Sequence, residues 1–260
     1  ALHRSDMKET RETRRRVEEI TPYGGVSSKG GQVEQMFDAI APAYDLMNTA
    51  MTFGLHRWWR NRALRLVAAE HPKAALDVAT GTGDVAFALW RRCRPERIAG
   101  MDLSEGMLAV ARRKLAGMDK DAQRAISFEQ GDSLAMRYGD AEFDAVTVAY
   151  GVRNFERLED GLREMLRVLR PGGQLCVIEL SQPRQRLTRA LYTFYSRRLI
   201  PLVGRMVSGD SRAYTYLPES IAAAPQRDDM TALMRRAGFE DCRWRSLTFG
   251  AVTIYTAHRP

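Results

Sequence analysis

Short apolar runs alternate with helical segments through most of this chain, and this alternation restricts the possible folds more than any other feature. The runs of strand length are residues 74–79, 98–101, 126–128, 143–149 and 174–180. The helical patterns between and after them are residues 84–92, 104–116, 158–169 and 228–237. Strands separated by helices pair in parallel and are covered on both faces. With two late strands near 240–248 and 251–258, the pattern predicts an α/β fold with a seven-stranded, mostly parallel sheet and a final antiparallel strand.

The N-terminal residues lie outside this pattern. Residues 1–31 are charged and then rich in glycine, which predicts a mobile arm. Residues 1–6 precede Met7, and we expect the native chain to begin at that methionine. The remaining residues, 32–260, have the length and apolar content of one domain.

Two helical segments are expected to cap the sheet. Residues 32–69 have a helical pattern that is broken near Pro42 and Gly54, so two or three helices precede the first strand. Residues 184–224 are also mostly helical and form the second cap or lid. Residues 171–173 (PGG) predict a helix stop and a tight turn into the next strand.

A glycine loop follows the first predicted strand. Gly81, Thr82 and Gly83 lie where a parallel sheet binds ligands, and glycine lets the backbone approach a ligand closely. With Ala86, the spacing also fits the loose dinucleotide fingerprint, so the loop alone allows either a nicotinamide cofactor or S-adenosylmethionine. Asp84 follows at the helix N-terminus, where a carboxylate disfavours a pyrophosphate. It suits a cationic ligand such as S-adenosylmethionine, which carries an ammonium and a sulfonium.

Acidic residues extend this candidate site at the ends of the next two strands. Asp102 closes the second strand, and its two oxygens can accept hydrogen bonds from ribose hydroxyls. Ser104 is the better candidate for the N-cap of the following helix. Asp132 and Ser133 follow the third strand and can bind the edge of an adenine, although by themselves they are equally typical of a turn. In series with the glycine loop, these residues predict an adenosine pocket.

Four segments resemble one family, the ubiquinone/menaquinone biosynthesis C-methyltransferases. Its two signatures are similar to residues 44–59 (YDLMNTAMTFGLHRWW) and residues 167–181 (RVLRPGGQLCVIELS). Its Gly-Val-Arg-Asn element and its late segment are similar to residues 151–154 (GVRN) and 208–221 (SGDSRAYTYLPESI). The departures are mild, with Thr52 where serine is usual and Arg170 where lysine is usual. The resemblance runs from about residue 32 to the C-terminus.

The resemblance implies a Rossmann-like class I methyltransferase fold, S-adenosylmethionine as cofactor, and methyl transfer to a ring carbon of a polyprenylated quinol. It places the cofactor contacts at Thr82, Asp102, Asp132 and Ser133. A serine that is frequent in the fourth-strand motif is Ala149 here, where a backbone group can replace the contact. Demethylmenaquinol is the expected acceptor, and 2-polyprenyl-6-methoxy-1,4-benzoquinol is the alternative.

Carbon methylation needs a nucleophilic ring carbon, which a quinol provides when one of its hydroxyl groups loses a proton. Arg153 follows the fourth strand and is predicted to stabilise the phenolate, with Asn154 orienting it; a surface ion pair is the structural alternative for the arginine. His56 is the candidate base, although a structural histidine that caps or packs against Trp59 is the favoured alternative. Tyr44 can cover the cofactor or the ring.

The positive charge of the chain suggests an anionic binding partner. The chain has a net charge of +8, and residues 184–213 place seven arginines among aromatic and aliphatic side chains with Asp210 as the single acid. Such a segment suits an anionic membrane surface and equally suits a lid with a solvated basic face. We expect a cytoplasmic protein that contacts the inner face of the membrane transiently. A homodimer is expected only from the resemblance.

Other classes of protein fit less well. The three cysteines are far apart and form no Cys/His group, so neither a metal site nor a disulfide framework is expected. A nucleic-acid methyltransferase would share the cofactor and the basic charge. The chain lacks the Asn/Asp-Pro-Pro-aromatic element after the fourth strand, so no nucleic-acid partner is expected. An NAD(P)-dependent oxidoreductase is the other distant alternative.

Overall fold

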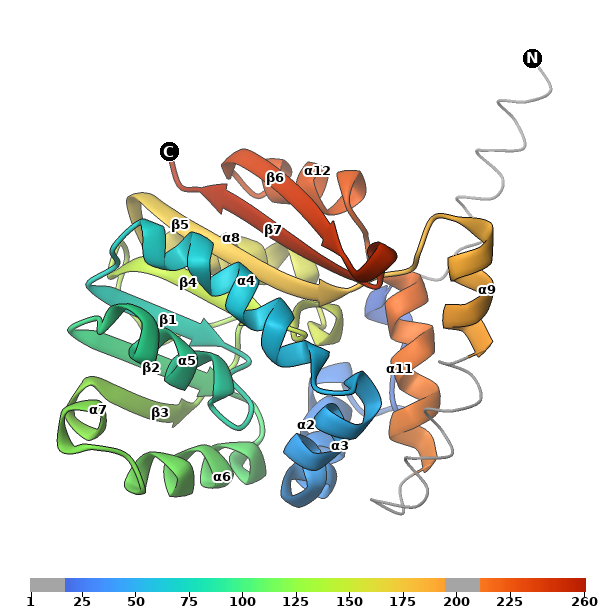
Figure 1. Ribbon diagram of the computed structural model, residues 1–260, viewed down its shortest axis with the longest axis horizontal. Helices are drawn as coiled ribbons and strands as arrows, with labels where there is room; N and C mark the ends of the chain where they lie inside the picture. The colour runs from blue at the N-terminus through green and yellow to red at the C-terminus, as the bar shows by residue number, and fades with distance from the viewer. Residues whose placement is uncertain (1–16, 195–210) are drawn as a thin grey trace.

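A seven-stranded sheet forms the centre of the protein (Figure 1) in a computed structural model that describes residues 17–194 and 211–260. The strands are β1 (Ala74–Val78), β2 (Arg97–Asp102), β3 (Ile126–Gln130), β4 (Phe143–Ala149), β5 (Leu169–Leu180), β6 (Glu240–Leu247) and β7 (Val252–His258). Their order is β3-β2-β1-β4-β5-β7-β6. Strands β1 to β5 pair in parallel, and β7 is antiparallel to both of its neighbours. The predicted fold class is confirmed.

Helices cover both faces of the sheet. On one face lie α4 (Leu55–Ala69), α5 (Asp84–Cys93), α6 (Glu105–Ala116) and α7 (Lys120–Ala125), and on the other lie α8 (Leu158–Val168) and α12 (Asp228–Arg236). Most strands, although not β3, supply both cores because successive side chains point to opposite faces. In β5, Leu175 and Val177 join the core with α8, whereas Cys176 and Ile178 join the core with α4 and α5.

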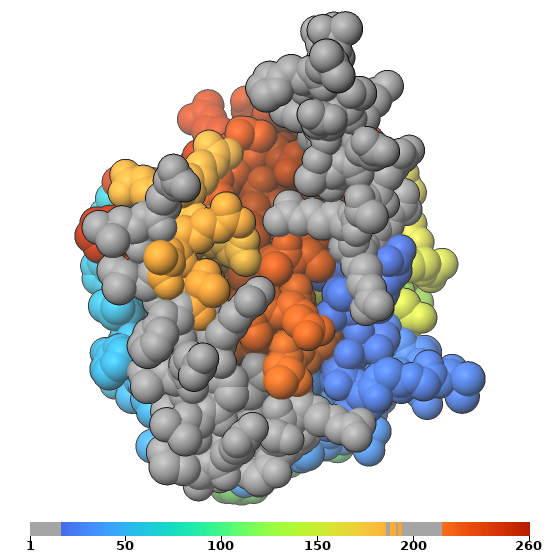
Figure 2. All heavy atoms as spheres, turned by 90° about the vertical axis from the view of Figure 1, so that its right-hand side faces the viewer, coloured from blue at the N-terminus to red at the C-terminus, as the bar shows by residue number. Residues whose placement is uncertain are grey.

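A further group of helices lies beyond the carboxyl ends of the parallel strands (Figure 1). It contains α2 (Lys29–Ile40), α3 (Tyr44–Thr52), α9 (Arg186–Phe194) and α11 (Ser211–Ala223). A third apolar cluster holds it together, with Ile40 of α2, Met47 of α3 and Tyr216 of α11 buried against Met107 of α6. Seen from that side, α9 and α11 form the surface next to the N-terminal helices (Figure 2). These elements correspond to the two predicted caps, except that α4, the last part of the first cap, covers a face of the sheet instead. Residues 195–210 of the second cap lie outside the described part of the chain.

The expected arm, residues 1–31, is partly packed where the structure describes it, from residue 17 onwards, although residues 24–28 are exposed. Val17 and Ile20 are buried, and α2 begins at Lys29. The Lys29 side chain is only 3% exposed, and its ammonium donates to the carbonyl groups of Val17 at 2.6 Å and Arg153 at 3.0 Å. The contact with Arg153 joins the segment to the turn that follows β4, at the carboxyl ends of the parallel strands. Of its glycines, Gly24 and Gly25 have left-handed backbone, whereas Gly30 and Gly31 belong to α2.

Two local predictions also need correction. Residues 171–173 do not separate a helix from a strand, because β5 already begins at Leu169 and the segment forms a register shift within it. Backbone hydrogen bonds with Arg259 hold Gly172 and Gly173 in the sheet. The short helix α7 was not predicted, since its six residues are too few to show a helical period.

In the described residues, no helix is long and apolar enough to span a bilayer.

Candidate active site

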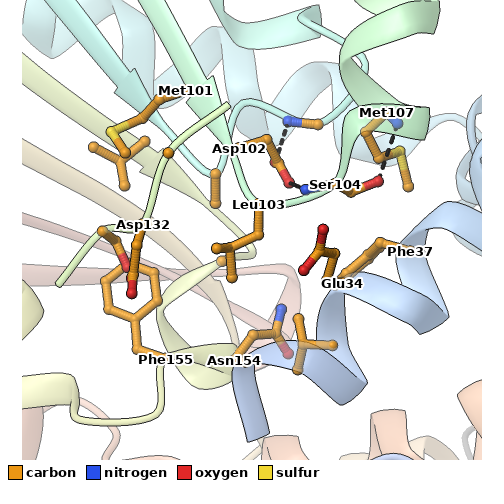
Figure 3. A pocket seen from close by; sticks show the side chains of 18 of the residues that line it. Glu34, Phe37, Met101, Asp102, Leu103, Ser104, Met107, Asp132, Asn154 and Phe155 are labelled. Atoms are coloured by element: carbon orange, nitrogen blue, oxygen red, sulfur yellow. Dashed lines mark hydrogen bonds between the residues drawn. The ribbon is translucent and has the colours of Figure 1, made fainter. Parts of the chain in front are cut away.

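A cavity of about 210 Å³ lies at the carboxyl ends of β1, β2 and β4, and residues of α2 form part of its wall. Figure 3 shows its wall, with Asp102, Leu103 and Ser104 facing Glu34 and Phe37. The expected residues that line it are Gly81, Asp102, Asp132, Ser133, Ala149, Asn154 and Tyr44. Tertiary structure thus brings most of the predicted adenosine pocket together.

Asp102 is fixed by backbone donors. One carboxylate oxygen accepts from the N–H of Gly81 at 2.8 Å, and the other accepts from the N–H of Ser104 at 3.0 Å (Figure 3). Burial raises the pKa of Asp102 to about 6, although these hydrogen bonds act in the opposite direction. Ser104 is the N-cap of α6, as predicted, and accepts from Met107 N–H at 3.1 Å. Asp102 is therefore held rigidly with acceptor capacity left for hydroxyl groups in the cavity.

The two positions in the loop require glycine for different structural reasons. At Gly81, with φ of 55°, a Cβ would meet only the Tyr44 ring at 4.0 Å, so this glycine leaves open space on the cavity side. At Gly83, with φ of 82°, a Cβ would lie 2.8 Å from the rings of both Phe87 and Phe128. Gly83 lines neither cavity of the site. Its role in this arrangement is close packing of the loop on the core.

The cavity wall is acidic. Four carboxylates line it, and the described residues around it include no lysine or arginine; the four are Glu34, Asp102, Asp132 and Glu156. Two of them, Glu34 of α2 and Glu156 after β4, were missed by sequence reasoning because no motif links them to the glycine loop. A wall with four carboxylates and no cation among its lining residues favours a cation and disfavours a pyrophosphate. The residues therefore fit S-adenosylmethionine, with its two positive groups, better than a dinucleotide.

Asp84 does not supply this acidity, and the reason given for it from the sequence needs correction. Its carboxylate lies 2.7 Å from Arg60 Nη1 and 3.0 Å from Lys114 Nζ. Burial opposes its charge, but the two cations hold the pKa of Asp84 below its usual value. Thr82 is engaged in the same network, since its hydroxyl donates to Asp45 at 2.6 Å. Both residues line a second cavity and not the first, so this network fastens α3 and α4 to the loop.

The second cavity has a volume of about 450 Å³ and a predominantly apolar wall. Cap helices provide most of this wall, through residues such as Met36, Met47, Trp59, Tyr192, Leu217 and Ile221. The two cavities adjoin, because six residues line both: Phe37, Tyr44, Ala79, Gly81, Ala149 and Tyr150. Tyr44 thus lies at the junction, with its ring edge-on to Phe37 at a centroid distance of 6.1 Å.

A buried ion pair lies at the wall of the second cavity. Arg153 is 6% exposed and Glu179 is 2% exposed, and Arg153 Nη1 lies 2.9 Å from the carboxylate. Burial opposes the charge of the guanidinium, but Glu179 together with Tyr216 and Tyr44 outweighs it and raises the pKa of Arg153. The surface ion pair considered from the sequence is therefore excluded. Glu179 was missed because a glutamate inside a buried strand has no sequence signal of its own.

Asn154 lies beside Arg153 but lines the first cavity. Its side-chain oxygen accepts from the Tyr216 hydroxyl at 2.9 Å, so the turn after β4 is joined to α11. This contact leaves the amide nitrogen as the group of Asn154 that can donate in the cavity. Arg153 and Asn154 therefore serve two adjoining cavities from one turn.

His56 lines the second cavity, and its tautomer follows from one neighbour. The Thr52 hydroxyl donates to the carbonyl of Asn48 at 2.6 Å and lies 2.8 Å from His56 Nδ1. Because a hydroxyl has one hydrogen to donate, Nδ1 must donate to Thr52, which leaves Nε2 as an acceptor. Burial lowers the pKa of His56 below 6.5, and Arg60 acts in the same direction. His56 is therefore neutral at pH 7 and can accept a proton.

Known proteins were compared with this chain. The ubiE/COQ5 methyltransferase family model matches residues 26–259. Demethylmenaquinone methyltransferase from Bacteroides fragilis is 44% identical over 240 residues, which are 92% of this chain and 97% of that protein. Ubiquinone/menaquinone biosynthesis C-methyltransferase UbiE from Geobacter sulfurreducens is 42% identical over 241 residues, which are 92% of this chain and 93% of that protein.

A solved structure supports the fold. An S-adenosylmethionine-dependent methyltransferase from Thermotoga maritima superposes with a TM-score of 0.59 at 16% sequence identity, over 87% of this chain and 99% of that one. The acidic cavity beside a glycine loop agrees with that fold class. Because the family model covers nearly the whole chain, this protein belongs to the ubiE/COQ5 methyltransferase family and is an S-adenosylmethionine-dependent methyltransferase.

Proposed function

We propose that this enzyme methylates a ring carbon of a polyprenylated quinol, and that the acceptor is demethylmenaquinol in menaquinone biosynthesis. The observation that carries the proposal is the large apolar cavity, which adjoins the acidic one and has a buried guanidinium in its wall. The names of the relatives from Bacteroides fragilis and Geobacter sulfurreducens support this substrate class. The second of these names keeps the methoxy-benzoquinol of ubiquinone synthesis as the alternative.

The acidic cavity is the proposed cofactor site. Asp102 would bind the ribose hydroxyls, Asp132 and Ser133 the adenine, and Gly81 and Ala149 would contact the cofactor through the backbone. Gly83, Asp84 and Thr82 would act indirectly, by holding the loop against Phe87, Arg60 and Asp45. When it is bound, S-adenosylmethionine supplies an electrophilic methyl group on its sulfonium.

The acceptor ring must carry negative charge to be nucleophilic. A buried guanidinium can donate hydrogen bonds to a phenolate, and a low-dielectric surrounding screens this interaction weakly. Arg153 is held in place by Glu179 and by the carbonyl of Tyr150, so it is ordered before the substrate binds. We assign Arg153 to phenolate stabilisation, Asn154 to orientation at the junction, and Tyr44 to covering the ring or the cofactor.

A base must accept the proton that the acceptor loses. His56 Nε2 is the candidate, since the residue is neutral and its other nitrogen is occupied by Thr52. The apolar wall excludes water, so proton transfer depends on a positioned side chain. The same wall accommodates an apolar chain, which a polyprenylated substrate brings.

The second cap is proposed to meet a membrane surface from the cytoplasmic side. Tyr192 of α9 and Tyr216, Leu217 and Ile221 of α11 line the apolar cavity, so opening of this cap would expose the cavity at the surface seen in Figure 2. Arg189 of α9 is exposed, and three further arginines fall in residues 195–210, outside the described part of the chain. A homodimer is a further expectation from the family.

The two acceptors can be compared directly. Purified enzyme is given demethylmenaquinol and the methoxy-benzoquinol together, with labelled S-adenosylmethionine, and the two products are separated. The proposal expects label predominantly in the naphthoquinol product. Label predominantly in the benzoquinol product would establish the alternative acceptor, and label in neither product would contradict the proposed function.

A further inference from the structure

Three buried donor atoms belong to residues in the wall of the apolar cavity and have no partner within the described chain. They are the Tyr150 hydroxyl, Arg153 Nε and Arg60 Nε. A buried polar group without a hydrogen bond costs free energy and needs an explanation. All three residues line one cavity through other atoms, so an occupant that draws their side chains toward it would satisfy these donors. An apolar cavity with several donors on its lining residues is suited to an aromatic ring that carries oxygen atoms.

Tyr150 is the most informative of the three because its backbone is also unusual. Its φ is 60°, in the left-handed region that a bulky residue rarely adopts. The conformation is held from both sides: its N–H donates to Ile178 O at 2.7 Å, and its carbonyl accepts from Arg153 Nη1. Strained backbone of this kind is concentrated at functional sites, where the surrounding structure enforces it. Here it places a tyrosine at the junction of the two cavities.

We propose that the Tyr150 hydroxyl donates a hydrogen bond to an oxygen of the hydroxylated aromatic substrate, beside Arg153, and so stabilises the phenolate that is methylated. The assignment rests on the proposed function. No proton leaves Tyr150 in this step: its O–H remains intact, and the substrate proton goes to the base.

The surroundings of Tyr150 agree with a donor and exclude a base. Burial raises the pKa of its hydroxyl far above the usual value, and Glu179 and Tyr44 act in the same direction. Arg60 and Arg153 act in the opposite direction without reversing the shift. The hydroxyl is therefore protonated throughout the working pH range.

The test compares Tyr150→Phe with Tyr138→Phe. Tyr138 is a matched control, since it is partly buried, its hydroxyl pKa is also raised by burial, and it lines neither cavity. For Tyr150→Phe we expect kcat/KM for the quinol to fall at least about tenfold, which corresponds to one hydrogen bond to a charged oxygen. The substitution keeps the ring, which also lines the acidic cavity, so the dissociation constant for S-adenosylmethionine should stay within about threefold of wild type.

Two further readouts separate a catalytic hydroxyl from a structural one. Tyr150→Phe removes a buried donor without a partner, so its thermal midpoint should equal or exceed that of wild type. The bound phenol should also become harder to ionise, so the deficit in kcat/KM should shrink as pH rises. A wild-type kcat/KM at every pH, or a loss of activity together with a lower thermal midpoint, would overturn the assignment. If wild-type enzyme methylates no quinol, the proposed function itself fails, and the Tyr150 assignment fails with it.

Discussion

Arg153 and Glu179 form an ion pair that is buried almost completely, with 2.9 Å between Nη1 and the carboxylate. The pair joins the turn after β4 to the end of β5, because Glu179 also accepts from the backbone N–H groups of Arg153 and Leu180. The guanidinium is thus ordered by the protein alone. A preorganised charge stabilises an anion without the cost of reorienting solvent or side chains.

Replacing Glu179 by Gln should destabilise the protein, because it leaves the Arg153 charge buried without compensation. We expect a loss of about 3 kcal/mol or more in the free energy of unfolding, measured by urea denaturation. The matched control is Glu159→Gln, which weakens the surface pairs with Arg163 and Arg236 and should cost at most about 1 kcal/mol. Equal effects of the two substitutions would show that burial of the pair is energetically unimportant.

Cofactor binding should depend on the ionisation of Asp102. Burial raises the pKa of this carboxyl to about 6, so it is ionised at pH 7.5 and becomes protonated as pH falls through that value. Affinity for S-adenosylmethionine, measured by titration calorimetry, should therefore decrease between pH 7.5 and 5.5. Asp102→Asn should bind at least about tenfold more weakly at pH 7.5, by roughly one charge-assisted hydrogen bond. A wild-type pH dependence in that variant would assign the titration to another group.

Alanine should have different effects at the two glycines of the loop. At Gly83 it forces a Cβ to within 2.8 Å of two phenylalanine rings, and overpacking of this kind costs about 1–3 kcal/mol of stability, in addition to the left-handed backbone. At Gly81 the space is open, so Gly81→Ala should lose only about 1 kcal/mol, through its backbone, yet weaken cofactor binding. Thermal unfolding and calorimetry of both variants check this contrast, which a larger loss of stability in Gly81→Ala would contradict.

The assignment of His56 as the base predicts a defect in turnover without a defect in cofactor binding. His56→Gln should lower kcat by about 100-fold, within the usual range for a general base. In wild type, kcat should fall as pH drops through the lowered pKa of His56, because protonation removes the acceptor at Nε2. Thr52→Val should have a smaller effect, since it removes only the partner that fixes the tautomer. If His56→Gln retained the acidic limb of the wild-type pH profile, another residue would be the base.

Membrane contact predicts binding to anionic vesicles that weakens with salt. The protein should sediment with phosphatidylglycerol vesicles at low ionic strength. It should stay in the supernatant as the ionic strength approaches about 0.15 M, where the Debye length is about 8 Å. Neutral phosphatidylcholine vesicles are the control and should retain much less. Equal retention on both kinds of vesicle would exclude the basic segment as the cause.

Much of this architecture could be predicted from the sequence because it depends on neighbours along the chain. The alternation of apolar runs and helices predicted the seven-stranded sheet, and β4 was predicted to its limits at Phe143 and Ala149. Ser104 was identified as a cap because capping is a contact within four residues. The position of Asp102 at the end of β2 followed in the same way, since all parallel strands end at one edge of the sheet.

Contacts between residues far apart in the chain were decided only by the tertiary structure. The sequence placed Asp84 correctly at a helix N-terminus but could not show that Arg60 and Lys114 neutralise it. Glu34, which adds to the acidic wall, comes from a helix that precedes the sheet. Side-chain charge is a local property, whereas the potential in a cavity is a sum over every element that surrounds it. For that reason the sequence alone predicted a cofactor site, and folding determined which residues make it acidic.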